Sequence, residues 1–311
     1  MGQIVLTLPL SKIETMQQAY QNQLKTAPQG AIFAAKTTTS SITAYRSGKV
    51  LFQGKQPEVE AAKWGNIDTP LPKKQTKTKK AHAFSPSNTL FQQSHIGSDE
   101  AGTGDYFGPI TVCAAYVKDS QIELLKELGV RDSKNLTDDS IRAIAKKLLQ
   151  LELPYSLVVL HNEKYNQLQA KGWTQGKMKT MLHHHAISKL LTKIAPSKPA
   201  GVLIDQFCEP HVYERHLKSE NATIQENVYF LTKAESHSIA VAAGSIIARA
   251  SFVKEMEKLS DKAGFNLPKG ASAKVDQSAA YLMKKQGKEN LQFFAKVHFA
   301  NTKKAAKYYK K

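Results

Sequence analysis

The segment SDEAGTGDYFGP, residues 98–109, joins two strand-like runs of the sequence. It contains three carboxylates, three glycines and few bulky side chains. Acidic residues at the edge of a buried run are rare unless they are paired or bind a metal ion, and glycines let the backbone bend tightly. A plain turn needs no acids and a packing strand tolerates few glycines. The segment therefore predicts a strand end that carries a function.

The residues that follow alternate between strand-like and helix-like patterns. We expect strands at 94–99, 109–117, 155–160, 201–207 and 228–234, and helices at 119–128, 137–150, 175–195 and 236–259. The second of these helices follows Thr137, a suitable N-cap, and has apolar residues along one face. The alternation predicts an α/β domain over residues 95–311, with helices covering a central sheet and a basic tail at the C-terminal end.

The first 68 residues predict a separate, small α+β domain. Its expected elements follow the order strand, helix, strand, strand, strand, helix and lie at 4–8, 11–24, 31–39, 41–46, 49–54 and 57–65. Ser11 and Glu14 have the spacing of a capping box at the start of the first helix. Pro57 occupies a favoured first-turn position of the second helix.

Residues 69–94 have the composition of a linker. They are rich in Pro, Lys, Thr and Ser and carry five lysines and no acid. Like-charge repulsion keeps such a segment extended. We therefore expect three parts, residues 1–68, a basic linker at 69–94, and residues 95–311. The linker is either a solvated tether or a tether that also contacts phosphates.

Composition excludes several classes of protein. The 311 residues are 41% hydrophobic and 23% charged, as in soluble globular proteins. No apolar run approaches the roughly 18 residues that cross a membrane, and the N-terminus lacks the features of a secretory signal. Cys113 and Cys208 are too few for a disulfide framework or a zinc cluster. They fit reduced thiols, so we expect a cytoplasmic protein.

The charge of the chain predicts a polyanionic partner. The formal net charge is +18, and residues 254–311 alone carry 14 lysines against five acids. Such an imbalance favours nucleic acid. The basic segments are not interleaved with an apolar helical face, which argues against a membrane surface. No obligate protein partner is evident from the sequence.

Acidic residues end three of the expected strands. Asp99 and Glu100 end the first, Asp205 follows an aliphatic run, and Glu235 follows VYFLTKA. A single acid of this kind fits a helix cap or an ion pair, but functional groups of α/β sheets gather beyond strand ends. Adjacent strand residues point to opposite faces, so Asp99 and Glu100 share a site only if the chain bends there, as the glycines from Gly102 allow.

Carboxylate oxygens select Mg²⁺ or Mn²⁺ rather than zinc. A carboxylate cluster without a nucleophile–base pair fits metal-assisted attack of water on a phosphodiester. Two ions roughly 4 Å apart activate the water and stabilise the leaving oxygen in such reactions. The basic surplus then supplies the track for the phosphate backbone.

The motif GSDEAGTGDYFGPI resembles the signature of the type 2 ribonuclease H family, in which an Asp-Glu pair precedes a Gly-x-Gly turn. Further matches, in the family's order, are DSKNL, the aspartate of LIDQF, and KAE followed by AVAAGSIIARASF. The similarity covers about residues 94–300. Thr103 between the glycines, and the domain at 1–68, are more similar to the bacterial HIII group than to the HII group.

This resemblance implies a fold and an activity. The fold is a ribonuclease H-like mixed central sheet flanked by helices, preceded by a small TATA-binding-protein-like α+β domain that binds substrate. The activity is two-metal-ion hydrolysis of the RNA strand of RNA/DNA hybrids, with Mg²⁺ or Mn²⁺, leaving 5′-phosphate and 3′-hydroxyl ends. Incision at single ribonucleotides in DNA, as in the HII group, and an inactive nucleic-acid-binding protein are the alternatives.

The resemblance also implies the site residues Asp99, Glu100, Asp205 and Glu235 as catalytic metal ligands. In the family's arrangement Asp99 lies between the two ions, Asp205 and Glu100 complete the coordination, and Glu235 holds the second ion or positions water.

Substrate contacts are expected from a turn and a loop. A backbone without side chains at Gly102, Thr103 and Gly104 can approach ribose 2′-hydroxyls, which distinguish RNA from DNA. Lys134 of DSKNL is either a phosphate contact or a solvated loop residue.

We interpret Asp105 as lying outside the site. The run His183–His185 cannot converge on one ion, because successive helical residues lie about 100° apart, and it predicts a helix surface with one packed imidazole.

Overall fold

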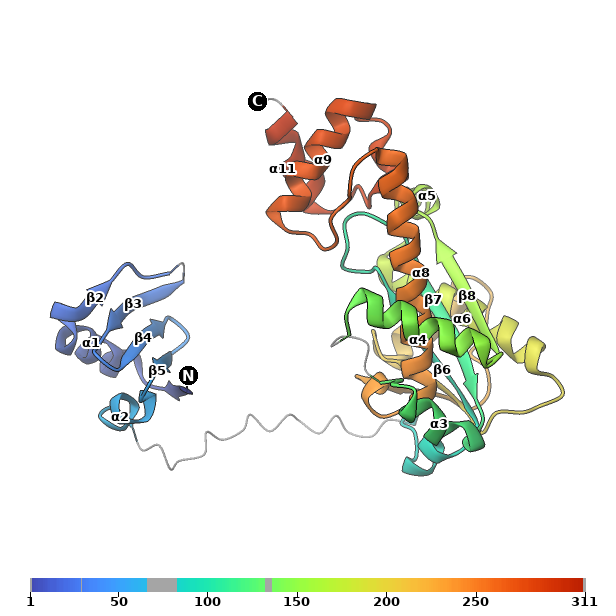
Figure 1. The fold of residues 1–311 in the computed structure, drawn as a ribbon, viewed down its shortest axis with the longest axis horizontal. Coiled ribbons are helices and arrows are strands. Elements are labelled where there is room, and N and C mark those ends of the chain that lie inside the picture. Colours follow the sequence, from blue (N-terminus) through green and yellow to red (C-terminus); the bar gives the residue numbers. More distant parts are fainter. Residues whose placement is uncertain (1, 29, 66–82, 132–135, 310–311) are drawn as a thin grey trace. The chain divides into compact units, whose positions relative to one another are not determined.

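The computed structural model of the chain describes residues 2–28, 30–65, 83–131 and 136–309. The chain divides into two compact units, Met1–Ala81 and His82–Lys311 (Figure 1). None of the described helices is long and apolar enough to cross a membrane.

The N-terminal unit is a five-stranded antiparallel sheet with two helices. The strand order is β1-β5-β4-β3-β2, and the strands are β1 (Gly2–Thr7), β2 (Leu24–Lys25), β3 (Ala31–Lys36), β4 (Ser40–Tyr45) and β5 (Lys49–Gly54). Helix α1 (Leu10–Ala19) buries Ile13 and Met16 against Phe33, Ile42 and Phe52 of the sheet. The second helix is α2 (Pro57–Ala62), which starts at the predicted proline.

The predicted capping box at Ser11 and Glu14 is wrong. Pro9, in an extended conformation, is the N-cap of α1, and no side chain makes a hydrogen bond at this cap. The helix also ends at Ala19, before the predicted residue 24. Tyr20 is the C-cap residue, and its buried hydroxyl donates to Glu60 at 2.8 Å and accepts from the Trp64 indole at 2.7 Å. The chain then forms the short strand β2, which the sequence did not predict.

The second unit is built on a five-stranded mixed sheet of order β10-β9-β6-β7-β8. Its strands are β6 (His95–Ala101), β7 (Ile110–Val117), β8 (Tyr155–Leu160), β9 (Val202–Asp205) and β10 (Val228–Leu231). Strands β6, β9 and β10 run parallel to one another, and β7 pairs antiparallel with both β6 and β8. All five predicted strands are present, and the predicted mixed α/β architecture is confirmed.

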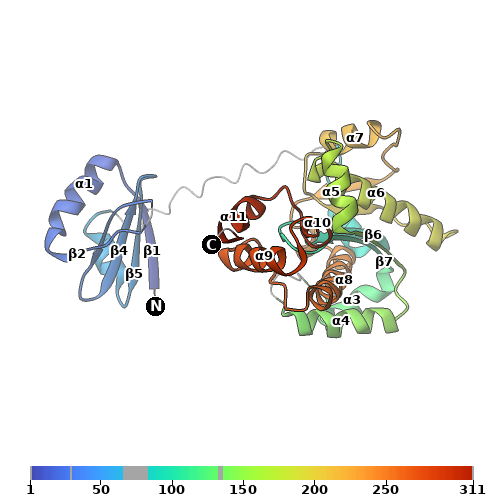
Figure 2. The same cartoon turned by 90° about the horizontal axis from the view of Figure 1, so that it is seen from above.

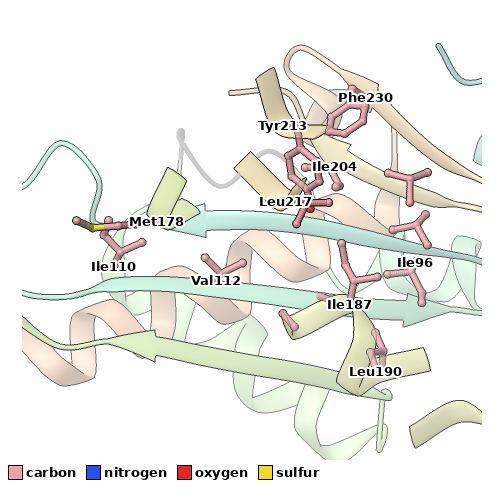
Figure 3. Close-up of a cluster of buried hydrophobic side chains, with 14 of the residues drawn as sticks. Ile96, Ile110, Val112, Met178, Ile187, Leu190, Ile204, Tyr213, Leu217 and Phe230 are labelled. Carbon is pink, nitrogen blue, oxygen red and sulfur yellow. The ribbon is translucent and has the colours of Figure 1, made fainter. Parts of the chain in front are cut away.

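Helices cover both faces of this sheet (Figure 2). One face carries α3 (Ile122–Glu127), α4 (Asp138–Gln150) and α8 (Ile239–Ala263), and the other carries α5 (Asn162–Ala170), α6 (Gln175–Ile194) and α7 (Pro210–Lys218). The Thr137 side chain caps α4 as predicted, because it accepts a hydrogen bond from Ser140 N at 3.2 Å. Figure 3 shows the core on the α6 and α7 face, where Ile96 and Ile204 pack against Ile187 and Leu217.

The C-terminal residues form a helical layer rather than a tail. Helices α9 (Ala273–Gln286), α10 (Leu291–Phe294) and α11 (Ala300–Tyr309) lie there. In α11, Ala305 is buried and the Asn301 amide donates to Asp276 at 2.5 Å. The prediction of a basic tail missed this helix because its buried face consists of small and polar residues within a lysine-rich segment.

Part of the predicted linker packs onto the second unit. The Phe84 carbonyl accepts from Phe230 N at 2.9 Å, and the two rings meet edge to face with centroids 6.0 Å apart. Leu90 is buried in the 3-10 helix η2 (Asn88–Gln92). Residues 66–82, which carry the lysines of the linker, lie outside the described residues.

Helix α8 packs unusually closely against β6, because a glycine lies at the contact. A Cβ placed on Gly97 would lie 2.0 Å from Val241 N and 2.2 Å from Ala240 C, both in the helix backbone. On the helix side, a Cβ on Gly244 would lie 2.9 Å from the Cys113 carbonyl oxygen. Backbone atoms cannot move aside as a flexible side chain can, so these two glycines set the distance between helix and sheet.

We predict that Gly97→Ala lowers the free energy of unfolding by at least about 2 kcal/mol, because the new methyl group forces α8 away from the sheet. Chemical denaturation of the full chain measures the change. Gly176→Ala, near the start of α6, is the matched control, because its Cβ meets only ordinary contacts at 3.8 Å. Equal stabilities of the Gly97→Ala and wild-type chains would contradict the close packing.

Candidate active site

A hollow of about 430 Å³ lies where the parallel strands β6 and β9 end. Ten residues line it, from β6, from the turn that follows, from β9 and from α8: Asp99, Glu100, Ala101, Gly102, Thr103, Gly104, Asp105, Asp205, Ser245 and Arg249. The hollow thus brings together three of the four predicted acids and the predicted glycine turn.

Asp99 and Asp205 lie side by side in the sheet and face α8. The register pairs Ser98 with Ile204, so the two aspartates occupy the next level of adjacent parallel strands. Asp99 accepts hydrogen bonds from Glu100 N at 2.7 Å and from the Ser245 hydroxyl on α8. Asp205 accepts from Ala234 N at 2.9 Å. Both carboxylates are therefore fixed by neighbouring donors on the same side of the sheet.

Glu100 lies on the opposite face, because β6 does not end or bend at Asp99. The strand continues to Ala101, and Glu100 stays in register with Val112 of β7. The predicted strand end at Asp99 is therefore wrong. Alternation along the strand turns the Glu100 side chain toward α6. Glu100 nevertheless lines the hollow.

Two residues of α6 hold the Glu100 carboxylate. Lys179 Nζ donates to Glu100 Oε1 at 2.8 Å, and His183 Nε2 lies 3.0 Å from Oε2. His183 is fully buried, its Nδ1 lies 2.7 Å from the Ser98 hydroxyl, and its ring stacks on Phe207 with centroids 5.1 Å apart. Lys179 Nζ lies 4.1 Å from the centroid of the same Phe207 ring. The orientation of Glu100 is thus set by a helix on the face away from Asp99.

The sequence predicted only part of this arrangement. The expectation of one packed imidazole in His183–His185 agrees with the buried His183, but its contact with Glu100 was not predicted. The signal was present, because Lys179 and His183 are four residues apart and hence on one face of a helix. What the sequence lacks is any indication that this face meets Glu100, 79 residues away along the chain from Lys179.

Glu235 follows β10 in the 3-10 helix η5 (Ala234–Ser236), directly after the residue that donates to Asp205. Its side chain is 3% exposed. Among the described residues, Glu235 is not one of those that line the hollow. Glu235 thus follows Ala234, the donor to Asp205, but it is buried and does not border the hollow.

The electrostatics of the two neighbouring acids differ. Burial raises the pKa of Asp99 well above its usual range, and the negative charges of Glu100 and Asp205 raise it further. Burial acts in the same direction on Glu100, but the hydrogen bonds and positive charge from His183 and Lys179 outweigh it and lower the pKa of Glu100 to about 2. Of these two carboxylates, Asp99 is the one whose negative charge the protein compensates less.

The two glycines of the turn have different roles. Gly102 has φ +87°, and a Cβ there would lie 2.3 Å from the Pro109 carbonyl oxygen, so the fold itself requires glycine. A Cβ on Gly104 would meet no atom within 4 Å. No described residue demands glycine at that position, which leaves the backbone beside the hollow open to an external group. The Thr103 carbonyl between them accepts from the Gln175 amide at 3.0 Å.

Two predicted residues remain, Lys134 and Asp105. Lys134 lies outside the described residues. The described end of its loop is held by Arg249, which lines the hollow and donates to the Leu136 carbonyl at 2.9 Å and to Asp138 at 3.3 Å. Asp105 also lines the hollow, but its carboxylate accepts from Gly270 N at 2.5 Å and so serves the fold.

The donor set fits a divalent metal ion. Mg²⁺ is commonly bound by one or two carboxylates, with water and substrate phosphate completing the shell. Asp99 and Asp205 supply such a pair on one face. Burial and the negative charges of Glu100 and Asp205 raise the pKa of Asp99, and a bound cation would offset this excess of negative charge. In the described part of the chain, no three Asp, Glu, His or Cys side chains gather into a preformed metal cage. The pair, rather than a closed cage, is what the protein offers.

Comparison with known proteins shows which family this chain resembles. The family described as Ribonuclease HII matches residues 96–302, and a family described as a domain of unknown function, DUF3378, matches residues 3–77. A Ribonuclease HIII from Oceanobacillus iheyensis is 58% identical over 308 residues, 99% of either chain. A Ribonuclease HIII from Bacillus thuringiensis subsp. konkukian is 54% identical over 303 residues, 97% of either chain.

Solved structures show the same similarity. A crystal structure of a mutant of Bst-RNase HIII superimposes with a TM-score of 0.70 at 43% identity and covers 100% of both chains. The crystal structure of Bst-RNase HIII in complex with Mn²⁺ gives a TM-score of 0.69 at 44% identity over 99% of both chains.

Fold, site and comparisons together define a metal-dependent ribonuclease of the ribonuclease H type. The chain belongs to the ribonuclease HII family and, within it, to the ribonuclease HIII proteins.

We predict that Asp99→Asn raises the free energy of unfolding of the metal-free chain by about 1 kcal/mol at neutral pH, because it removes a buried charge that Glu100 and Asp205 repel. The pKa of Asp99 in the folded protein is raised above its ordinary value of 3.8. The folded protein therefore loses stability as the pH rises from 3.8 through the raised pKa. The advantage of Asn should therefore disappear below about pH 3.8.

Chemical denaturation in chelator, at neutral and at acidic pH, measures this difference. Asp119→Asn, at an exposed surface position before α3, is the control for loss of one carboxylate. A destabilised Asp99→Asn chain at neutral pH would show that the carboxylate is fully compensated by its hydrogen bonds.

Proposed function

We propose that this protein hydrolyses the RNA strand of RNA/DNA hybrids at the hollow beside β6 and β9, using Mg²⁺ or Mn²⁺. The observation that carries the proposal is the pair Asp99 and Asp205 on one face of the sheet, next to a turn whose Gly104 is open to an external group. The pair suits a divalent ion, and the open backbone suits a ribose. Together they select an RNA phosphodiester.

Asp99 and Asp205 would hold the ions, and Glu100 and Glu235 would complete the set of four catalytic metal ligands. Bound divalent ions lower the pKa of water and stabilise the leaving oxygen, and the products are a 5′-phosphate and a 3′-hydroxyl. The chain's own contribution is orientation: Ser245 and Glu100 N fix Asp99, Ala234 N fixes Asp205, and Lys179 with His183 fixes Glu100. Preorganised groups of this kind avoid rearrangement during the reaction.

Recognition of the RNA strand is assigned to the turn. Main-chain groups at Gly102, Thr103 and Gly104 border the hollow, and Gly104 has no neighbour within 4 Å of a Cβ position. Ribose 2′-hydroxyls both donate and accept hydrogen bonds, so a bare backbone can read them at close range. Lys134 would add a phosphate contact from the neighbouring loop.

The N-terminal domain is assigned to substrate binding. Its formal charge is +3 over residues 1–68, seven basic residues minus four acidic ones. Bulk charge alone therefore contributes little, and binding would use the shape and hydrogen-bonding groups of the sheet. The larger basic surplus lies in the second unit and the segment before it.

We predict that the chain cleaves a uniform RNA/DNA hybrid in Mg²⁺ or Mn²⁺ and loses cleavage in chelator, because attack by water requires the ions. Asp99→Asn and Asp205→Asn should lower kcat by at least about a thousandfold while leaving hybrid affinity within about threefold, since the acids act on the reaction more than on binding. Gel analysis of labelled strands and fluorescence anisotropy measure the two quantities.

A duplex with one embedded ribonucleotide separates the alternatives. Weak incision at the single ribonucleotide beside strong cleavage of the uniform hybrid supports the proposal. Efficient incision there would instead assign the activity of the HII group. A wild-type chain that binds the hybrid but cleaves neither substrate would be a nucleic-acid-binding protein without catalysis.

We predict that a chain lacking residues 1–68 binds the hybrid at least about tenfold more weakly but keeps metal-dependent cleavage, because the site lies wholly in the second unit. Affinity by anisotropy and kcat at saturating hybrid measure the effect. Unchanged affinity would refute a substrate-binding role for the N-terminal domain.

A further inference from the structure

Lys296 is a fully buried lysine outside the catalytic hollow. It lies between α10 and α11 in the C-terminal helical layer, with 0% of its surface exposed. Its Nζ donates to the Asp105 carbonyl at 2.8 Å and to the Gly108 carbonyl at 2.6 Å. Both acceptors belong to residues 105–108, which we call the post-turn segment because it directly follows Gly102–Gly104.

Hydrogen bonds connect residues 270–296 to the post-turn segment along its whole length. Gly270 N donates to the Asp105 carboxylate at 2.5 Å, and Tyr106 N donates to the Gly270 carbonyl at 2.9 Å. Lys296 N donates to the Tyr106 carbonyl at 2.8 Å, and Gly108 N donates to the Phe294 carbonyl at 2.9 Å. The rings of Tyr106 and Phe107 are buried in the same layer.

Further hydrogen bonds fix the turn itself. Asp105 N donates to the Gly102 carbonyl at 3.3 Å and so closes the turn. On its other side, the Thr103 carbonyl accepts from Gln175, the first residue of α6. The backbone of the turn is thus fixed from two directions, by α6 at Thr103 and by the C-terminal layer at Asp105.

A lysine is an expensive choice for a buried position. Desolvation lowers the pKa of Lys296 to about 7, with the charge of Asp105 acting in the opposite direction. The amine and the ammonium both have at least two N–H groups, enough for the two carbonyls that Nζ contacts. A methionine would fill the same volume without this cost, so packing does not account for the residue. Its specific contribution is the pair of hydrogen bonds to the post-turn segment.

We propose that Lys296 is a positioning residue for recognition of the RNA strand: it fixes the post-turn segment, and through Asp105 the Gly102–Gly104 turn, from behind. The C-terminal helices, which contribute no residue to the lining of the hollow described above, then set the accuracy with which the turn meets a ribose. This inference rests on the proposed role of the turn in binding the hybrid.

The test uses Lys296→Met in the full chain, which keeps length and apolar volume but removes both hydrogen bonds. We expect KM for the uniform hybrid, and Kd in chelator, to rise about tenfold while kcat stays within about twofold, since the acids are untouched. Mn²⁺ affinity, measured by calorimetry without nucleic acid, should not change. Lys296→Gln, which keeps a donor on a shorter side chain, should raise KM less than Met does.

A matched control separates positioning from general loosening. Met283 is 1% exposed in the core cluster that contains Tyr106 and Phe107, and its side chain has no N–H or O–H group with which to donate to the post-turn segment. Met283→Ala should lower Tm, as Lys296→Met does, but leave KM unchanged. All variants are assayed at a temperature at which circular dichroism shows them folded.

Gly104→Val, which places a side chain on the open face of the turn, tests the proposed function in parallel. Raised KM in Gly104→Val with normal KM in Lys296→Met would overturn the inference and leave the proposed function intact. Normal KM in both variants would remove the turn from substrate binding. An equal rise in KM for Met283→Ala would reduce Lys296 to one of many stabilising residues.

Discussion

The close contact between α8 and β6 is the constraint on which the site depends. Because Gly97 and Gly244 let the helix backbone approach the strand, Ser245 reaches Asp99, and Arg249, one turn further, reaches the rim of the hollow. A wider gap would leave Asp99 without its donor from the helix. The small residues of α8 are thus a packing device with a direct effect on the carboxylate geometry.

Strand alternation then divides the acids between two faces. Asp99 and Asp205 face α8, whereas Glu100 faces α6 and is held by Lys179 and His183. The two faces also differ in charge balance, because the protein supplies positive groups to Glu100 and leaves Asp99 to be repelled by its neighbours. This division lets the fold accommodate two adjacent carboxylates, because Glu100 is neutralised by α6 while Asp99 keeps a negative charge that a cation can bind.

The sequence predicted the elements with strong hydrophobic patterns. The five strands of the mixed sheet and the long helices α6 and α8 were expected close to their observed bounds. Helices α5, α7 and α9–α11 were missed. The buried faces of α5 and α11 contain mainly polar or small residues, whereas α7 and α10 bury aromatic and aliphatic residues but are short, with nine and four residues. Three of the four acids lie at one hollow, but the strand continues two residues beyond its predicted end at Asp99. The partners of Glu100 and the grip of Lys296 depend on tertiary contacts between distant segments, which local spacing does not encode.

The most direct test of this account is anomalous diffraction at the manganese edge from crystals of the full chain with Mn²⁺ and an uncleaved RNA/DNA hybrid. We predict manganese bound to the carboxylates of Asp99 and Asp205, with the RNA strand crossing the turn so that a 2′-hydroxyl meets the backbone at Gly104. Manganese at any other set of side chains, or a hybrid bound away from the turn, would contradict it.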